Sequence, residues 1–123
     1  MDKLKTLFAM IVESVPPAYN WEMDGRFSTP FVQLDMGDTK PVKESMSSIF
    51  DNEWDSSSLN DASALEKNLA KCFFGIEKGQ ILFTTLENDI VLFCAWWPWG
   101  NNSKVSLRIG YFSEENKFFS ESE

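Results

Sequence analysis

One uninterrupted apolar run, Ile90–Trp97 (IVLFCAWW), limits the possible folds of this chain more than any other stretch. Neither side of such a segment can face water, so both faces must be covered. Short polar or turn-forming segments precede and follow it, at Glu87–Asp89 and Pro98–Ser103. The sequence therefore predicts a three-stranded antiparallel meander over residues 80–112, with the apolar run as its central strand.

The last strand of this meander, Lys104–Phe112, alternates in polarity. Its odd positions carry large apolar side chains, whereas its even positions include Ser106, Arg108 and Gly110. Because successive side chains of a strand point to opposite faces, the pattern predicts that one face of this strand is solvated.

The amino-terminal residues are predicted to form an amphipathic helix. Apolar residues recur at spacings of three and four from Leu4 to Val15, and Pro16-Pro17 end the pattern. The apolar run stops at Glu13 and no small-residue cleavage site follows, so a secretion signal is not expected. No stretch reaches the roughly 18 apolar residues that span a bilayer, and we expect a cytoplasmic protein that packs this helix on the sheet.

A hairpin is expected next. Tyr19, Trp21 and Met23 alternate with polar residues, and Asp24-Gly25 is a dipeptide that favours tight hairpin turns. Residues 31–34 supply the partner strand.

Residues 37–58 are the least regular part of the sequence. They are polar and rich in turn formers, yet they include scattered large apolar residues, namely Val42, Met46, Ile49, Phe50 and Trp54. This mixture predicts a long loop held down by apolar anchors, with at most one helical turn near residues 45–50.

A second helix is expected to begin at a cap within Ser58–Asp61 and to continue to Phe73, with Gly75 after its end. Residues 113–123 are polar and acidic and are predicted to be a frayed tail. The complete pattern predicts one α+β domain over residues 1–123, with two helices and a mainly antiparallel sheet of about five strands. The expected order is helix, two strands, loop, helix, three strands.

The composition argues against several chemistries. The chain has no histidine, so the commonest general base and metal ligand are missing. Cys72 and Cys94 are far apart in sequence and are expected to be buried reduced thiols. Carboxylates are plentiful but match no calcium-loop spacing, and no phosphate-binding glycine motif is present. We therefore predict no catalytic residue, no metal site and no cofactor.

The net charge of −8 has consequences for binding. It opposes association with nucleic acid or an anionic membrane and favours a cationic protein partner. Between Pro16 and Glu66 ten residues are acidic and three are basic, so most of the excess charge lies there.

Acidic residues alternate with aromatic ones in two places, residues 21–24 and 50–55. Carboxylates pair with cations across an interface and tryptophans are favoured interface anchors, so both segments are candidate contacts. Trp96, Trp97 and Trp99 cannot all point inward at a strand end, so one of them is expected at the surface. The predicted partner-binding residues are Glu22, Asp24, Asp51, Glu53, Trp54, Asp55, Asp61 and Trp99. The alternative is that Trp54 is a core residue and the acids only keep the surface soluble.

In general character the chain resembles the immunity proteins that bacteria carry against their own secreted toxins, such as those of contact-dependent growth inhibition systems. The resemblance rests on small size, acidity, lack of histidine and carboxylates flanked by aromatic residues. It implies one-to-one binding of a basic toxin domain, often a nuclease, whose active or substrate-binding surface is occluded. Two alternatives stay open: a small acidic secretion chaperone that binds an effector segment, and a small-ligand binder or enzyme that uses residues 96–99 as a pocket wall.

Overall fold

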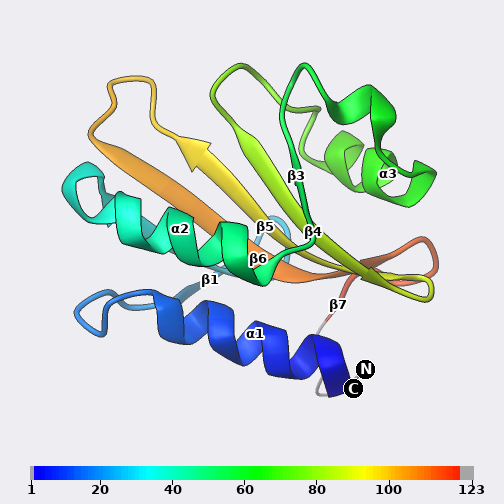
Figure 1. Ribbon diagram of the computed structural model, residues 1–123, viewed down its shortest axis with the longest axis horizontal. Coiled ribbons are helices and arrows are strands. Elements are labelled where there is room, and N and C mark those ends of the chain that lie inside the picture. Colours follow the sequence, from blue (N-terminus) through cyan, green and yellow to red (C-terminus); the bar gives the residue numbers. More distant parts are fainter. Residues whose placement is uncertain (1, 120–123) are drawn as a thin grey trace.

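A seven-stranded antiparallel sheet forms the centre of the computed structural model, which describes residues 2–119 (Figure 1). Three α-helices lie on its faces: α1 (Asp2–Ser14), α2 (Thr39–Ile49) and α3 (Ala64–Cys72). Two 3-10 helices are η1 (Met36–Asp38) and η2 (Leu59–Asp61). The strands are β1 (Glu22–Asp24), β2 (Thr29–Asp35), β3 (Asn52–Trp54), β4 (Ile81–Glu87), β5 (Ile90–Pro98), β6 (Lys104–Ser113) and β7 (Lys117–Phe119).

The strand order is β1-β2-β6-β5-β4-β3, and β7 pairs with β6 outside this path. Along one side β6 pairs with β5. Along its other side it pairs first with β2, at residues 104–108, and then with β7, at residues 111–113. A strand from the first third of the chain and the last described strand therefore pair along the same side of β6.

The predicted meander is confirmed as β4, β5 and β6, and the predicted α+β class with a mainly antiparallel sheet is confirmed as well. Residues 91–96 are buried on both faces of β5, as the apolar run requires. The numbers differ from the prediction of two helices and about five strands, because residues 37–58 and the tail contribute further elements.

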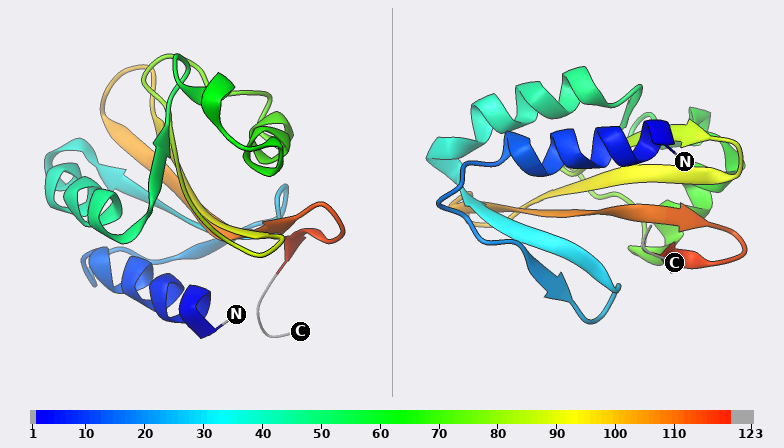
Figure 2. Two further views of the ribbon diagram at one scale, coloured as in Figure 1. Left: turned by 45° about the vertical axis from the view of Figure 1, so that its right-hand side comes forward. Right: turned by 90° about the horizontal axis from the view of Figure 1, so that it is seen from below.

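Helices α1 and α2 lie side by side on one face of the sheet, and α3 lies on the other (Figure 2). The first face holds the larger core. Side chains of alternating sheet positions meet there with the apolar stripes of the two helices, among them Leu4, Ile11, Val42, Met46, Phe83, Leu92, Trp96, Leu107 and Tyr111. The second face holds an aromatic core around α3 that includes Leu69, Phe73, Leu82, Phe93 and Phe112.

The prediction of a long loop over residues 37–58 was wrong. The segment forms α2 and β3. Of its expected apolar anchors, Val42, Met46 and Ile49 belong to the helix, Phe50 follows it and Trp54 lies in β3. Val42, Met46 and Ile49 follow a four-three spacing that faces the sheet. Pro41 is tolerated because it lies in the first turn, where its missing N–H has no partner to lose.

The expected cap of the second helix was also misplaced. Residues 59–61 form η2, and α3 begins only after Ser63. The Ser63 hydroxyl accepts from the Glu66 backbone N–H, while the Glu66 carboxylate accepts from the Ser63 backbone N–H. This reciprocal capping box satisfies two helix-end donors at once.

The predicted solvated face of β6 is covered. Trp99 Nε1 donates to Ser106 Oγ at 3.0 Å, and the Phe27 ring stacks on the Arg108 guanidinium. Gly110 is closely covered as well, because a Cβ at this position would lie 3.3 Å from both the Phe93 ring and the Thr29 methyl group. Residues distant in sequence therefore cover a face that its own polarity pattern marks as exposed.

Other predictions near the termini need adjustment. The amino-terminal helix is confirmed as α1, whereas the first strand is shorter than expected and starts at Glu22. The tail is not frayed over residues 117–119, which form β7, and residues 120–123 lie outside the described part. Cys72 and Cys94 are free, Cys94 buried and Cys72 only partly so. Over residues 2–119 no helix combines the length and the apolarity that a bilayer crossing requires.

Candidate protein-binding site

Four of the predicted site residues, Asp51, Glu53, Asp55 and Asp61, lie on the β3–η2 segment, which we call the acidic edge. β3 is the last strand of the sheet on this side, so one of its edges has no strand neighbour within residues 2–119. All four side chains are exposed, and none forms an ion pair with another described residue. The acidic edge therefore presents four negative charges that the described chain does not neutralise.

The pairing of β3 with β4 fixes where these carboxylates point. Glu53 lies opposite Phe83 and Trp54 opposite Leu82. Because directly opposed side chains share a face, Glu53 projects on the side of α1 and α2, and Trp54 on the side of α3. The start of the strand is anchored by the Asp51 backbone N–H, which donates to Thr85 Oγ1 at 2.9 Å.

Asp55 also has a structural role. Its Oδ1 accepts from the Ser57 hydroxyl at 2.8 Å, the Ser57 N–H at 2.9 Å and the Ser58 N–H at 3.0 Å. These hydrogen bonds, led by those from Ser57, hold the pKa of the Asp55 carboxyl below its usual value. The residue thus shapes the turn into η2 and keeps its negative charge in mildly acidic solution.

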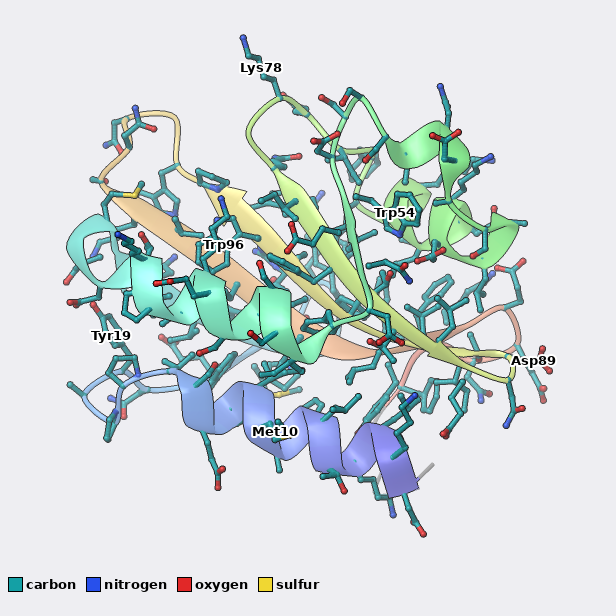
Figure 3. The ribbon with its side chains drawn as sticks, viewed as in Figure 1. Met10, Tyr19, Trp54, Lys78, Asp89 and Trp96 are labelled. Carbon is teal, nitrogen blue, oxygen red and sulfur yellow. The ribbon has the colours of Figure 1, made fainter. Side chains whose placement is uncertain are left out.

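Trp54 is not a free anchor. Its indole Nε1 donates to Glu66 Oε2 at 2.6 Å and to Thr84 Oγ1 at 3.2 Å, and its ring packs into the aromatic core under α3 (Figure 3). Trp54 is partly buried and contributes to the fold, which agrees with the alternative prediction that it is a core residue and not an interface anchor.

The acceptor of that bond, Glu66, is a carboxylate only 2% exposed. Burial raises the pKa of Glu66, but hydrogen bonds from Thr84, Trp54 and Ser63 outweigh this effect, so the pKa lies below its usual value. Glu66 is therefore ionised at neutral pH and joins the start of α3 to β3 and β4. Sequence reasoning counted it only as one of many acids.

The other three predicted site residues lie elsewhere. Glu22 and Asp24 belong to β1, at the opposite edge of the sheet, and Trp99 lies in the β5–β6 connection. Asp24 Oδ2 accepts from Arg108 Nε at 2.6 Å. Burial raises the pKa of Asp24, but its hydrogen bond with Arg108 and bonds from backbone N–H groups outweigh this and lower it.

Glu22 is exposed, and Trp99 is 36% exposed even though its indole N–H bonds to Ser106. Trp96 is buried and Trp97 partly buried, so Trp99 is the most exposed of the three tryptophans, in agreement with the expectation that one lies at the surface. The predicted residues consequently do not form one site: one group lies at the β3 edge, Glu22 and Asp24 lie on β1, and Trp99 lies in the β5–β6 connection.

A cavity of about 610 Å³ opens near the acidic edge. It lies between the first half of α3, the β4–β5 turn and the β6–β7 turn, and its first lining residue, Ala64, follows Asp61 by three positions. A second hollow of about 540 Å³ lies between α1 and α2. Residues 96–99 line neither of them, and over residues 2–119 no three metal-ligating side chains converge.

Sequence reasoning missed one exposed aromatic residue. Phe74 follows α3 with a left-handed φ of 64° and is 81% exposed. The Arg26 guanidinium lies between the rings of Phe74 and Phe27, at 5.6 and 5.1 Å from their centroids. Left-handed backbone at the end of a helix normally favours glycine, so the sequence did not indicate it at a phenylalanine. The only sequence sign of this conformation was that Phe74 directly precedes Gly75.

The chain was also compared with known proteins. It matches no protein-family model, no curated protein and no solved structure.

Proposed function

We propose that this protein is an acidic immunity protein that neutralises a cationic toxin domain by covering its active or substrate-binding surface. The acidic edge is the observation that carries the proposal. Its four carboxylates are exposed and lack a cation within the described chain. A basic partner would supply the missing cations.

Three carboxylates elsewhere have a cation of the same chain beside them. Asp24 pairs with Arg108, Asp35 with Lys104 at 2.6 Å and Glu114 with Lys117 at 3.7 Å. Charges that are paired inside a molecule add little to the attraction of a partner, whereas a cluster of unpaired like charges produces a field that steers an oppositely charged protein. The acidic edge brings four such unpaired charges together within eleven residues of the chain.

A nuclease toxin fits this chemistry because it must hold phosphates with lysines and arginines. A protein that offers carboxylates in place of phosphates competes with nucleic acid for the same cations. Partners of this type bury roughly 800 Å² on each side, which is enough to cover the acidic edge and its surroundings. The proposal implies a one-to-one complex in the bacterial cytoplasm, without nucleic acid or membrane contact.

The test begins with identification of the partner by pull-down from the source cell and by co-expression with the product of the neighbouring gene. If that product is a toxin, co-expression should restore growth. Its association rate with this protein should fall steeply as the salt concentration rises, whereas the dissociation rate should change little.

Two variants with the same change in net charge localise the effect. The acidic-edge variant carries Asp51→Asn, Glu53→Gln and Asp61→Asn, and leaves Asp55 in place because that residue holds the turn. The control variant carries Asp2→Asn, Glu13→Gln and Glu44→Gln, which are exposed positions on α1 and α2.

The acidic-edge variant should bind at least about tenfold more weakly than the control, since it loses local contacts as well as general attraction. Equal affinities of the two variants, or an association rate that does not respond to salt, would contradict the proposal. A dimer that binds a disordered segment with weak salt dependence would instead indicate a secretion chaperone.

A further inference from the structure

The cavity beside α3 has a lining suited to one kind of ligand. We propose that it receives a lysine or arginine side chain of the basic partner, an inference that rests on the function proposed above. We call it the α3 cavity. It is bounded by residues of α3, the β4–β5 turn and the β6–β7 turn, and its volume is about 610 Å³.

The lining of the α3 cavity combines partly buried apolar side chains and neutral polar ones with exposed acidic ones. Leu65 and Ile90 are partly buried lining residues, whereas Asp89, Glu114 and Glu115 are exposed ones. Long cationic side chains have the matching structure, because an aliphatic stem prefers apolar surface while the charged head stays near water and carboxylates. A purely apolar ligand would leave the acidic rim without a partner.

Internal contacts occupy only one of the three carboxylates. Glu114 Oε2 accepts from Asn68 Nδ2 of α3 at 3.0 Å, and Glu114 Oε1 lies 3.7 Å from Lys117 Nζ. These contacts hold the β6–β7 turn against α3. Asp89 and Glu115 have no side-chain hydrogen bond or ion pair with another described residue, so their oxygens are open to an external donor.

The two open carboxylates come from different turns. Asp89 lies at the outer tip of the β4–β5 turn, as Figure 3 shows, and Glu115 belongs to the β6–β7 turn. The pairing of Glu87 with Ile90 leaves only two residues in the β4–β5 turn, which restricts the position of Asp89. A guanidinium, which has five N–H donors in one plane, can bond to two separate carboxylates at once.

The α3 cavity and the acidic edge adjoin each other in the chain at the start of α3. Asp61 closes η2, and Ala64 opens both α3 and the cavity lining. One partner surface can therefore reach both. The acidic edge would chiefly speed association, and a side chain enclosed in the cavity would chiefly slow dissociation.

The experiment uses N-acetyl-arginine N-methylamide as a probe and its citrulline counterpart as a neutral control of nearly equal shape. Both are titrated into the full protein labelled with ¹⁵N and ¹³C-methyl groups. Saturable shifts are expected in the side-chain amides of Asn68, Asn88 and Asn116 and in the methyl groups of Leu65 and Ile90. Citrulline should produce no comparable shifts.

Asp89→Asn combined with Glu115→Gln should weaken probe binding by about tenfold or more, because it removes both open carboxylates. The matched control, Glu13→Gln with Glu44→Gln, removes the same charge from the hollow between α1 and α2 and should leave probe binding in the α3 cavity unchanged. Equal shifts with citrulline, shifts confined to other regions, or equal binding by the two variants would overturn the inference.

A second arm measures the rate at which the protein dissociates from the partner that the pull-down identifies. The Asp89→Asn/Glu115→Gln variant should dissociate from it about tenfold faster than the control variant. Unchanged dissociation despite lost probe binding would assign the cavity to a free small cation and overturn its role in partner binding. The probe titration does not require the partner. If the probe does not bind but the acidic-edge variant still binds the partner more weakly than its control, the cavity assignment is wrong and the proposed function stands. If the probe binds but the acidic-edge variant and its control bind the partner with equal affinity, the proposed function is wrong.

Discussion

The two edges of the sheet carry the same kinds of residue and use them differently. At the β1–β2 edge, the carboxylates of Asp24 and Asp35 are paired with Arg108 and Lys104, both of which belong to β6. At the β3 edge, the neighbouring strand β4 carries no lysine or arginine, and the exposed carboxylates have no such pairing. The cations of β6 therefore neutralise two acids at one edge, whereas no cation of β4 reaches the acids at the other.

The aromatic residues show the same division. Phe27 and Phe31 at the β1–β2 edge stack on the Arg108 guanidinium, so that ring, cation and carboxylate form one group. Trp54 at the β3 edge donates its N–H to the buried Glu66 carboxylate and forms no hydrogen bond with the exposed acids of the acidic edge. An aromatic residue beside an acid in the sequence can therefore mean either arrangement. The predictions below test this difference, beginning with the largest expected effect.

Replacing Trp54 should be the most damaging change at the acidic edge. Trp54→Ala removes a packed ring and one donor of the buried Glu66, and we expect the free energy of unfolding to fall by about 3 kcal/mol. Urea denaturation followed by circular dichroism measures this loss. Trp54→Phe, which keeps a ring but no N–H, should lose less. Full stability of Trp54→Ala with reduced partner binding would return Trp54 to the interface.

Breaking the pair at the other edge should have the next largest effect. Arg108→Ala leaves the Asp24 carboxylate, whose side chain is 12% exposed, without its cation, and should lower the free energy of unfolding by about 2 kcal/mol at pH 7. The pKa of folded Asp24 is lowered, so its stabilising effect is complete above the unfolded pKa of about 4 and is lost as the pH falls through the folded value.

The difference in stability between the natural protein and Arg108→Ala should therefore shrink in acid. Urea denaturation at pH 7 and at pH 3 checks this. A difference that stays constant over that range would mean that Arg108 acts through its stacking on Phe27 and Phe31 and not through its charge.

A smaller loss is expected for Asp55→Ala, because this carboxylate accepts three local hydrogen bonds in the turn before η2. The midpoint of thermal unfolding should fall by less than in Arg108→Ala. Asp55→Asn, which keeps an acceptor oxygen, should recover most of it. Identical midpoints for Asp55→Ala and the natural protein would show that the turn does not depend on this residue.

The smallest effect on the fold is expected from the acidic-edge variant. Because Asp51, Glu53 and Asp61 are exposed and have no ion pair within residues 2–119, their neutralisation should leave the free energy of unfolding within about 0.5 kcal/mol. Urea denaturation is again the measurement. A larger loss of stability would mean that these acids stabilise the fold, as Asp24 does.

Local sequence patterns were enough to predict the meander and α1, since their apolar residues repeat with the period of the element that they form. Helix α2 was missed because eight of its eleven residues are polar or proline, which masks the spacing of Val42, Met46 and Ile49. A weak local pattern of this kind becomes a helix only when the sheet offers an apolar face to cover.

The site was also predictable only where local sequence determines it. Exposure of the acids at Asp51, Glu53, Asp55 and Asp61 follows from a polar segment beside an edge strand. The role of Trp54 depends on Glu66 and Thr84, which lie 12 and 30 positions further along the chain. No local pattern states that these three side chains meet, and the α3 cavity likewise arises from three segments that only the fold brings together.

The position of β6 has a consequence for how the chain reaches this fold. β2 pairs with residues 104–108 of β6. The β1–β2 hairpin is synthesised early, but it can join the sheet only after β6 has left the ribosome. The meander forms from neighbours in sequence and should fold first, since short loops close at a lower entropic cost. During that interval the β1–β2 hairpin exposes Phe27, Phe31 and an unpaired edge. We expect nascent chains stalled before residue 104 to be the form of this protein most prone to aggregate and to bind chaperones.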